Sequence, residues 1–161
     1  MTTIFDGSFW MHSKEEFGEH VQKAISGLRA NEMPANCGIY IMANSKNGFV
    51  YVGRSVNMLK RAKLHIASME SGVHINRKLV DACKEYGRDA FRFHAMWACE
   101  PKDAWLLEKG AMFRMDIDKT YNLQNLYCAD SSFYRKIDGR KYYQDKCPKA
   151  GRLQGKEQKS R

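Results

Sequence analysis

Apolar residues recur at two different spacings along this chain, and the spacings predict its secondary structure. Short runs rich in β-branched and aromatic residues predict strands at 37–43, 49–53 and 91–97. Apolar residues three or four positions apart predict helices before, between and after these strands. The expected order is helix, strand, strand, helix, helix, strand, helix, which corresponds to a small sheet covered by helices.

The predicted helices have recognisable ends as well as apolar stripes. The first begins in a capping box at 13–16, the second is capped by Ser55 or Asn57, and Pro101 opens the last. Glycines close the second and third helices. The four stripes are, in chain order, Phe17, Val21, Ala24 and Leu28; Met58, Ala62, Ile66 and Met69; Ile75, Leu79, Cys83 and Tyr86; and Ala104, Leu107, Ala111 and Met115.

The first two strands are separated by residues 44–48, a turn cluster that ends in Asn-Gly and favours a hairpin. Tyr40 lies on the first strand and Tyr51 on the second. A hairpin would place the two tyrosines on neighbouring strands, where they could point into one site. Two ordinary core tyrosines fit the same pattern, because tyrosine is common in strands.

Charge is distributed unevenly along the chain. The 161 residues carry 27 Lys or Arg against 18 Asp or Glu, a formal net charge of +9. Counting from Arg135 to the end gives ten cations and three acids, or +7, which leaves +2 for the residues before it. This stretch has few aliphatic residues, so we expect an extended or disordered basic arm rather than a second domain; contact with nucleic acid and a tail that only aids solubility are both open.

The chain has five cysteines, widely spaced and without a C-x-x-C pair. This pattern argues against a zinc module or a disulfide framework and favours reduced intracellular thiols. We find no long apolar run for a membrane span and no signal-peptide pattern at the N-terminus. We therefore expect an intracellular, cytoplasmic protein with no membrane partner.

Several motifs follow one another in a set order: Gly-Ile-Tyr at 38–40, Tyr-Val-Gly at 51–53, then Arg61, His65, Glu108 and Asn122. Over residues 37–126 this order resembles the GIY-YIG nuclease family, closest in pattern to the catalytic domains of phage-type homing endonucleases. The resemblance implies an α+β fold with a small three-stranded antiparallel sheet flanked by helices. We expect an N-terminal helical extension at 1–34, the nuclease domain at 35–128 and a basic tail at 129–161.

Glu108 is the expected metal ligand. It borders the apolar stripe of its helix, and a partly buried carboxylate must be paired or coordinated. A single carboxylate suits Mg²⁺, or Mn²⁺ in its place, because Mg²⁺ keeps several waters and takes phosphate oxygens. The alternative is a surface carboxylate paired with Lys109 or Arg114.

Arg61 and His65 are four residues apart and share one helical face. We expect Arg61 to hold the scissile phosphate and offset its charge, although a solvated cation fits equally well without the motif. His65 and the tyrosines are candidates for proton transfer. Tyr40 is the preferred base or water-positioning residue and Tyr51 the second choice, and either would need nearby positive charge.

Other residues are expected to contact the substrate or brace the site. Asn122 could donate to phosphate or position Glu108, or it could be a turn residue. His74 matches a histidine of homing-type members, with a capping or surface role as the alternative. The predicted substrate-binding residues are Gly53, Arg54, His74, Arg135, Lys136, Arg140 and Lys141.

The expected function is a metal-dependent endonuclease that hydrolyses DNA by water attack. A homing or restriction-like enzyme with sequence preference, acting as a dimer, is the second reading. A nucleic-acid-binding protein that does not cleave is the third, although the complete motif set argues against it. The sequence leaves RNA as a possible substrate and does not decide between monomer and dimer.

Overall fold

A computed structural model describes residues 14–122 of the chain. Ser13 of the expected capping box, the basic tail with Arg135, Lys136, Arg140 and Lys141, and Cys128 and Cys147 lie outside the described residues. The elements are, in chain order, α1 (Lys14–Ile25), η2 (Ala30–Glu32), β1 (Gly38–Asn44), β2 (Val50–Ser55), α2 (Met58–Glu70), α3 (Arg77–Tyr86), η3 (Arg88–Ala90), β3 (Phe91–Ala98), α4 (Pro101–Phe113) and η4 (Ile117–Lys119).

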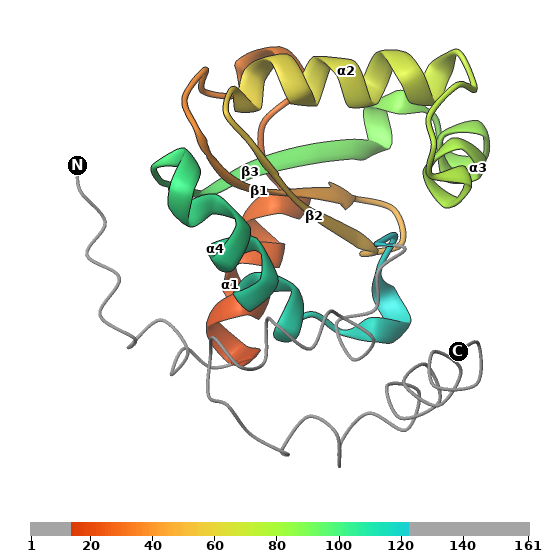
Figure 1. The fold of residues 1–161 in the computed structure, drawn as a ribbon. Helices are drawn as coiled ribbons and strands as arrows, with labels where there is room; N and C mark the ends of the chain where they lie inside the picture. Colours follow the sequence, from red (N-terminus) through yellow and green to blue (C-terminus); the bar gives the residue numbers. More distant parts are fainter. Residues whose placement is uncertain (1–13, 123–161) are drawn as a thin grey trace, which may run out of the picture. The chain divides into compact units, whose positions relative to one another are not determined.

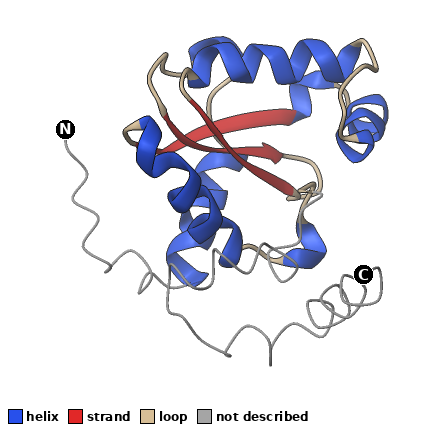
Figure 2. Ribbon diagram, viewed as in Figure 1, coloured by secondary structure: helices blue, strands red, loops and turns tan. Residues whose placement is uncertain are grey.

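The three strands form one antiparallel sheet in the order β2-β1-β3, so the first strand is central (Figure 1). The turn between β1 and β2 has Gly48 at φ 75°, a conformation that glycine adopts without steric cost. Helices α2 and α3 lie on one side of the sheet and α1 and α4 on the other (Figure 2). The α+β fold predicted from the resemblance is therefore confirmed.

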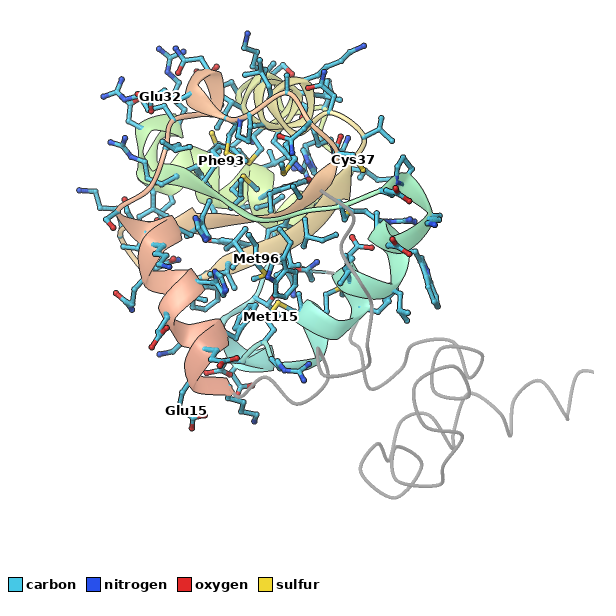
Figure 3. The ribbon with its side chains drawn as sticks, turned by 90° about the vertical axis from the view of Figure 1, so that its left-hand side faces the viewer. Glu15, Glu32, Cys37, Phe93, Met96 and Met115 are labelled. Atoms are coloured by element: carbon cyan, nitrogen blue, oxygen red, sulfur yellow. The ribbon has the colours of Figure 1, made fainter. Side chains whose placement is uncertain are left out.

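Each face of the sheet carries its own apolar core, because side chains alternate along a strand. Tyr40 and Met42 of β1 pack with residues of α2 and α3, among them Met58 and Leu79. Figure 3 shows Phe93 and Met96 of β3 on opposite faces, with Met96 directed toward Met115 on the side of α4. Side chains on one face of β1 thus pack against different helices from the side chains on the other face.

The outer edge of β2 is covered by the segment that follows η4. The Tyr121 backbone N–H donates to the Val50 carbonyl at 2.8 Å, and a parallel bridge joins Val50 to Thr120. The Tyr121 hydroxyl in turn accepts from the amides of Asn44 and Asn47 in the hairpin turn, at 3.0 and 3.1 Å. This segment protects an edge that would otherwise expose unpaired backbone groups.

Two apolar stripes differ from their predictions. Helix α1 ends at Ile25, and Leu28 instead exchanges backbone hydrogen bonds of 2.8 Å with Phe93 of β3. Gly27 permits this approach, since a Cβ there would lie 2.7 Å from the Lys23 carbonyl and overlap that of Phe93. Ile75 was expected inside the third helix, but α3 begins after it and the side chain is 90% exposed.

The helix ends agree more closely with the sequence patterns. Asn57 caps α2 by accepting from the Lys60 backbone N–H, Gly87 follows α3 with φ 82°, and Pro101 opens α4. The expected three-part division of the chain stays a prediction, although α1 packs on the same sheet as α4. No helix among residues 14–122 combines the length and the apolar character that crossing a membrane requires.

Candidate active site

The two motif tyrosines share the face of the sheet that α2 covers. Tyr40 is opposite Gly53 in the β1–β2 ladder and Met42 is opposite Tyr51, so Tyr40 and Tyr51 are diagonal neighbours. Their ring centroids are 6.5 Å apart. Tyr40 is 1% exposed, whereas Tyr51 is only half-buried.

Gly53 provides the space for the Tyr40 ring. A Cβ at Gly53 would lie 2.6 Å from the ring carbon that bears the hydroxyl and would overlap the hydroxyl itself. The Tyr40 side chain therefore lies directly over the backbone of β2. Gly53 is therefore needed because it leaves room for the Tyr40 side chain. Its own backbone conformation does not require glycine.

Helix α2 supplies Arg61 and His65 to the same space. The N-cap at Asn57 fixes where the helix starts, and the buried residues Met58, Ala62 and Met69 fix which face meets the sheet. Arg61 lies close enough to Tyr40 and Tyr51 to interact electrostatically with both. Burial disfavours its charge, but the two tyrosines outweigh this effect and raise the pKa of Arg61.

A chain of hydrogen bonds runs from the backbone of Asn76 to the hydroxyl of Tyr40. The Asn76 N–H donates to His74 Nδ1 at 3.0 Å, His74 Nε2 lies 2.9 Å from His65 Nδ1, and His65 Nε2 lies 2.7 Å from Tyr40 Oη. The rings of His65 and His74 stack with centroids 5.1 Å apart. His74 is therefore part of the buried cluster, and Asn76, not His74, caps α3.

Only one direction of proton donation satisfies this chain when both imidazoles are neutral. A backbone N–H can only donate, so His74 Nδ1 must accept and its proton must be on Nε2. His74 then donates to His65 Nδ1, which places the His65 proton on Nε2 and directs it at Tyr40. The Tyr40 oxygen thus accepts from His65.

The electrostatic surroundings keep these groups uncharged near neutral pH. Burial, together with the charges of Arg61 and His74, lowers the pKa of His65 to about 3. Burial and Arg61 also lower the pKa of His74. Burial raises the pKa of both Tyr40 and Tyr51, the nearby Glu108 adds to this effect, and Arg61 opposes it. Tyr40 and Tyr51 are accordingly protonated phenols, and Arg61 is the charged partner between them.

Glu108 approaches the site from the other side of β2. Arg54 follows Gly53 and so points to the face that α4 covers, where its Nε lies 3.1 Å from Glu108 Oε2. The Glu108 side chain is 16% exposed and that of Arg54 is 44% exposed. Burial raises the pKa of Glu108, against the opposing charges of Lys109 and Arg54. Arg114, an alternative partner from the sequence, donates to the Gly110 carbonyl at 3.0 Å.

The Glu108 carboxylate suits a divalent cation that keeps most of its waters. It is desolvated, and binding Arg54 through one oxygen leaves lone pairs for a metal. Among residues 14–122, no group of three or more His, Cys, Asp or Glu side chains could hold a metal ion. A closed zinc-type centre therefore does not fit the described residues, whereas a Mg²⁺ ion held by one carboxylate does.

Asn122 holds β2 in place. Its Oδ1 accepts from the Val52 N–H and its Nδ2 donates to the Val52 carbonyl, both at 2.9 Å. The Thr120 hydroxyl also donates to Asn122 Oδ1, at 3.1 Å. The amide thus acts like one residue of an extra strand beside Val52. Because Val52 lies between Tyr51 and Gly53, Asn122 braces the strand that carries three predicted site residues.

The structure brings most of the predicted site residues together. Tyr40, Tyr51, Arg61, His65 and His74 form one cluster, and Arg54 and Glu108 form a pair whose carboxylate acts electrostatically on the tyrosines. Sequence reasoning missed Asn76, which sets the proton position of His74. The signal was available: an asparagine directly before Arg77-Lys78-Leu79 is a typical helix N-cap.

Part of the chain matches a known protein family. The family model described as the GIY-YIG catalytic domain matches residues 36–109. Among solved structures, the chain is similar to a mutant catalytic domain of the intron endonuclease I-TevI, with 29% sequence identity and a TM-score of 0.48. That match covers 55% of this chain and 94% of the other. No match was found among curated proteins.

Proposed function

We propose that the protein is a metal-dependent endonuclease that hydrolyses DNA, from the premise that residues 36–109 match the GIY-YIG catalytic domain. The proposed reaction is attack of water on a backbone phosphodiester, with either the 3′ or the 5′ oxygen as the leaving group. Such a reaction needs charge stabilisation at the phosphate, a route for the water proton and help for the leaving oxygen. The residues of the cluster supply each of these.

Arg61 is the proposed phosphate-binding group. Its electrostatic interaction with Tyr40 and Tyr51 favours a guanidinium held near the two phenols before substrate arrives. A planar guanidinium offers two parallel N–H donors to phosphate oxygens. Arg61 would therefore stabilise the charge that develops on the phosphate during attack.

The tyrosine pair is the proposed proton acceptor. Tyr51 is the more exposed of the two, which favours it as the residue that contacts the attacking water, with Tyr40 behind it. His65 donates to the Tyr40 oxygen, the charge of Arg61 acts on the same group, and both favour its ionised form. Burial and the charge of Glu108 oppose ionisation of both phenols, so a further positive charge beside Glu108 is required before either acts as a base.

Glu108 is the proposed ligand of Mg²⁺ or Mn²⁺, with Arg54 as its neighbour at 3.1 Å. When bound, the cation supplies charge for the phosphate and the leaving oxygen and reverses the sign of the field that Glu108 exerts on the tyrosines. Arg54 would hold the carboxylate in position and contact the substrate backbone through its exposed part.

The observation that carries this proposal is the oriented hydrogen-bond chain from Asn76 to Tyr40, placed beside a desolvated carboxylate. Buried polar groups are costly unless each has a partner, and here each group is paired with the next in a chain that ends at the Tyr40 oxygen. A protein that only bound nucleic acid would need surface cations but no such arrangement.

The test is cleavage of supercoiled plasmid and of branched DNA, with Mg²⁺ or with a chelator. We expect cleavage by the wild-type protein in Mg²⁺ and none by Glu108→Gln, which keeps the shape but loses the charge that holds the cation. Binding of DNA by Glu108→Gln should largely survive. Glu85→Gln, at an exposed position of α3, is the matched control and should cleave normally.

The products also test the second reading. One active site cuts one strand, so a monomer should produce nicked circles first. Direct appearance of linear plasmid at unique positions would favour a sequence-specific dimer. Mg²⁺-dependent cutting by pure Glu108→Gln protein, at a rate near that of wild type, would contradict the assignment of Glu108. Cleavage of RNA but not DNA would overturn the choice of substrate.

A further inference from the structure

Two cysteines are opposite each other at one end of the sheet. Gly38 pairs with Ala98 in the β1–β3 ladder, and the Cys99 N–H donates to the Cys37 carbonyl at 3.1 Å, so Cys37 and Cys99 form the next opposite pair. Opposite residues in antiparallel strands have Cα atoms about 4.5–5.5 Å apart and point to the same face. A disulfide needs about 4.4–6.8 Å between Cα atoms. The backbone spacing therefore permits a bond between them.

Both thiols are partly exposed, whereas Cys83 on α3 is buried. Figure 3 shows Cys37 toward the end of the sheet where β3 leads into α4. Burial, the charge of Cys37 and a hydrogen bond with Cys37 raise the pKa of the Cys99 thiol to about 12. Cys99 thus keeps its proton near neutral pH, next to Cys37 across the ladder.

We propose that Cys37 and Cys99 are a thiol–disulfide exchange site, which low-molecular-weight disulfides such as oxidised glutathione convert into a cross-link between β1 and β3. The Cys37 thiolate attacks one sulfur of glutathione disulfide, forms a mixed disulfide and releases one glutathione thiolate, which takes up a proton. Cys99 then loses its proton to solvent and attacks the Cys37 sulfur, and the second glutathione leaves as thiolate. Two protein thiols are oxidised and one glutathione disulfide is reduced to two thiols.

The first step assists the second. Once Cys37 is bound to glutathione it carries no charge, so the repulsion that holds the proton on Cys99 disappears and the Cys99 thiolate forms more easily. The resulting thiolate is next to the sulfur that it must attack. This order assigns nucleophile and resolving roles to Cys37 and Cys99 respectively.

The cross-link would tie together the attachments of two site helices. The Asn36 carbonyl accepts the Met58 N–H at the start of α2, and α4 begins shortly after Cys99 at Pro101. Helix α2 carries Arg61 and α4 carries Glu108. A bond between residues about 60 positions apart also removes freedom from the unfolded chain, so the oxidised protein should resist unfolding more than the reduced one.

The test uses the full-length chain with Cys128→Ser and Cys147→Ser, so that Cys37, Cys83 and Cys99 remain. The protein is incubated with oxidised glutathione and analysed by intact mass, peptide mapping, maleimide labelling and urea unfolding. We expect a mass loss of two hydrogens, a mapped Cys37–Cys99 bond and a urea midpoint that moves upward, all reversed by dithiothreitol. Addition of Cys83→Ser should change none of these results.

Addition of Cys99→Ser should instead leave glutathione attached to Cys37, because no second thiol can resolve the mixed disulfide. The proposal would be overturned by any of three results. Glutathione could remain on Cys37 although Cys99 is present, all thiols could stay open to maleimide after oxidation, or the bond could map to Cys83. None of these readouts depends on nuclease activity.

Discussion

Acid should destabilise this protein through His65. In the folded state its pKa is lowered to about 3 by burial and by Arg61 and His74, whereas an unfolded histidine titrates at 6.5. Below pH 6.5 the unfolded chain therefore binds a proton that the folded chain refuses. The contribution of His65 to the free energy of unfolding is fully present above pH 6.5, falls as the pH drops toward 3 and changes no further below that value.

The size of the effect follows from the two pKa values. At pH 4.5 an unfolded histidine is almost fully protonated and the buried one almost fully neutral, which corresponds to a loss of roughly 3 kcal/mol. Near pH 3 the loss approaches about 5 kcal/mol. His65 is 1% exposed, so solvent screening should reduce this effect little.

The assay is urea unfolding, followed by circular dichroism, of wild type and His65→Gln between pH 7.5 and 4.5. Glutamine cannot titrate, so the variant should be less stable at pH 7.5 but should lack this part of the acid slope. The gap between the two proteins should shrink by roughly 3 kcal/mol across the range. Titratable groups that do not contact residue 65 contribute equally to both proteins and cancel in the difference.

Met69→Leu serves as the control, because Met69 is also buried in the α2 core but does not titrate. Met69→Leu should change stability by the same amount at every pH. Parallel profiles for wild type and His65→Gln would refute the reasoning, since they would mean that His65 is protonated in the folded protein. The direction of the hydrogen-bond chain to Tyr40 would then be wrong as well.

Three further outcomes are expected. Arg61→Lys keeps the charge but loses the planar pair of donors, so the single-turnover rate on saturating DNA should fall roughly 10²–10³-fold; a rate within about twofold of wild type would make Arg61 a surface cation. Gly53→Ala brings a Cβ within 2.6 Å of the Tyr40 ring, so it should lower the free energy of unfolding in urea by about 1–3 kcal/mol and impair cleavage. Gly18→Ala is the control and should do neither, because a Cβ at Gly18 has nothing within 4 Å. Truncation after Tyr134 should weaken DNA binding and flatten its salt dependence by roughly 3.6 in log–log slope if about four tail cations touch phosphate; equal slopes in fluorescence anisotropy would show that the tail does not.

The sequence by itself determined which segments become helices and strands and which tyrosines share a face. These features depend on neighbours within a few positions: the cap at Asn57, the glycine at 87, the Pro101 start and the alternation that places Tyr40 and Tyr51 on one side of a hairpin. The predicted strands differ from the observed ones only by a residue or two at their ends. Local signals are sufficient for these features because caps, turns and apolar spacing act within a few positions, even for β1, which is buried along its whole length.

Only the tertiary structure decided what the site residues contact. Glu108 pairs with Arg54, from a strand more than fifty positions earlier, in addition to lying near the charge of its helical neighbour Lys109. His74 could have been a cap or a surface residue, yet the Asn76 backbone turns its ring toward His65. These contacts depend on how whole elements pack against one another, and no local spacing encodes that arrangement. A hydrogen bond of 2.7 Å between Tyr40 and His65 exists because α2 lies over β1, where the Met58, Ala62 and Met69 side chains hold it.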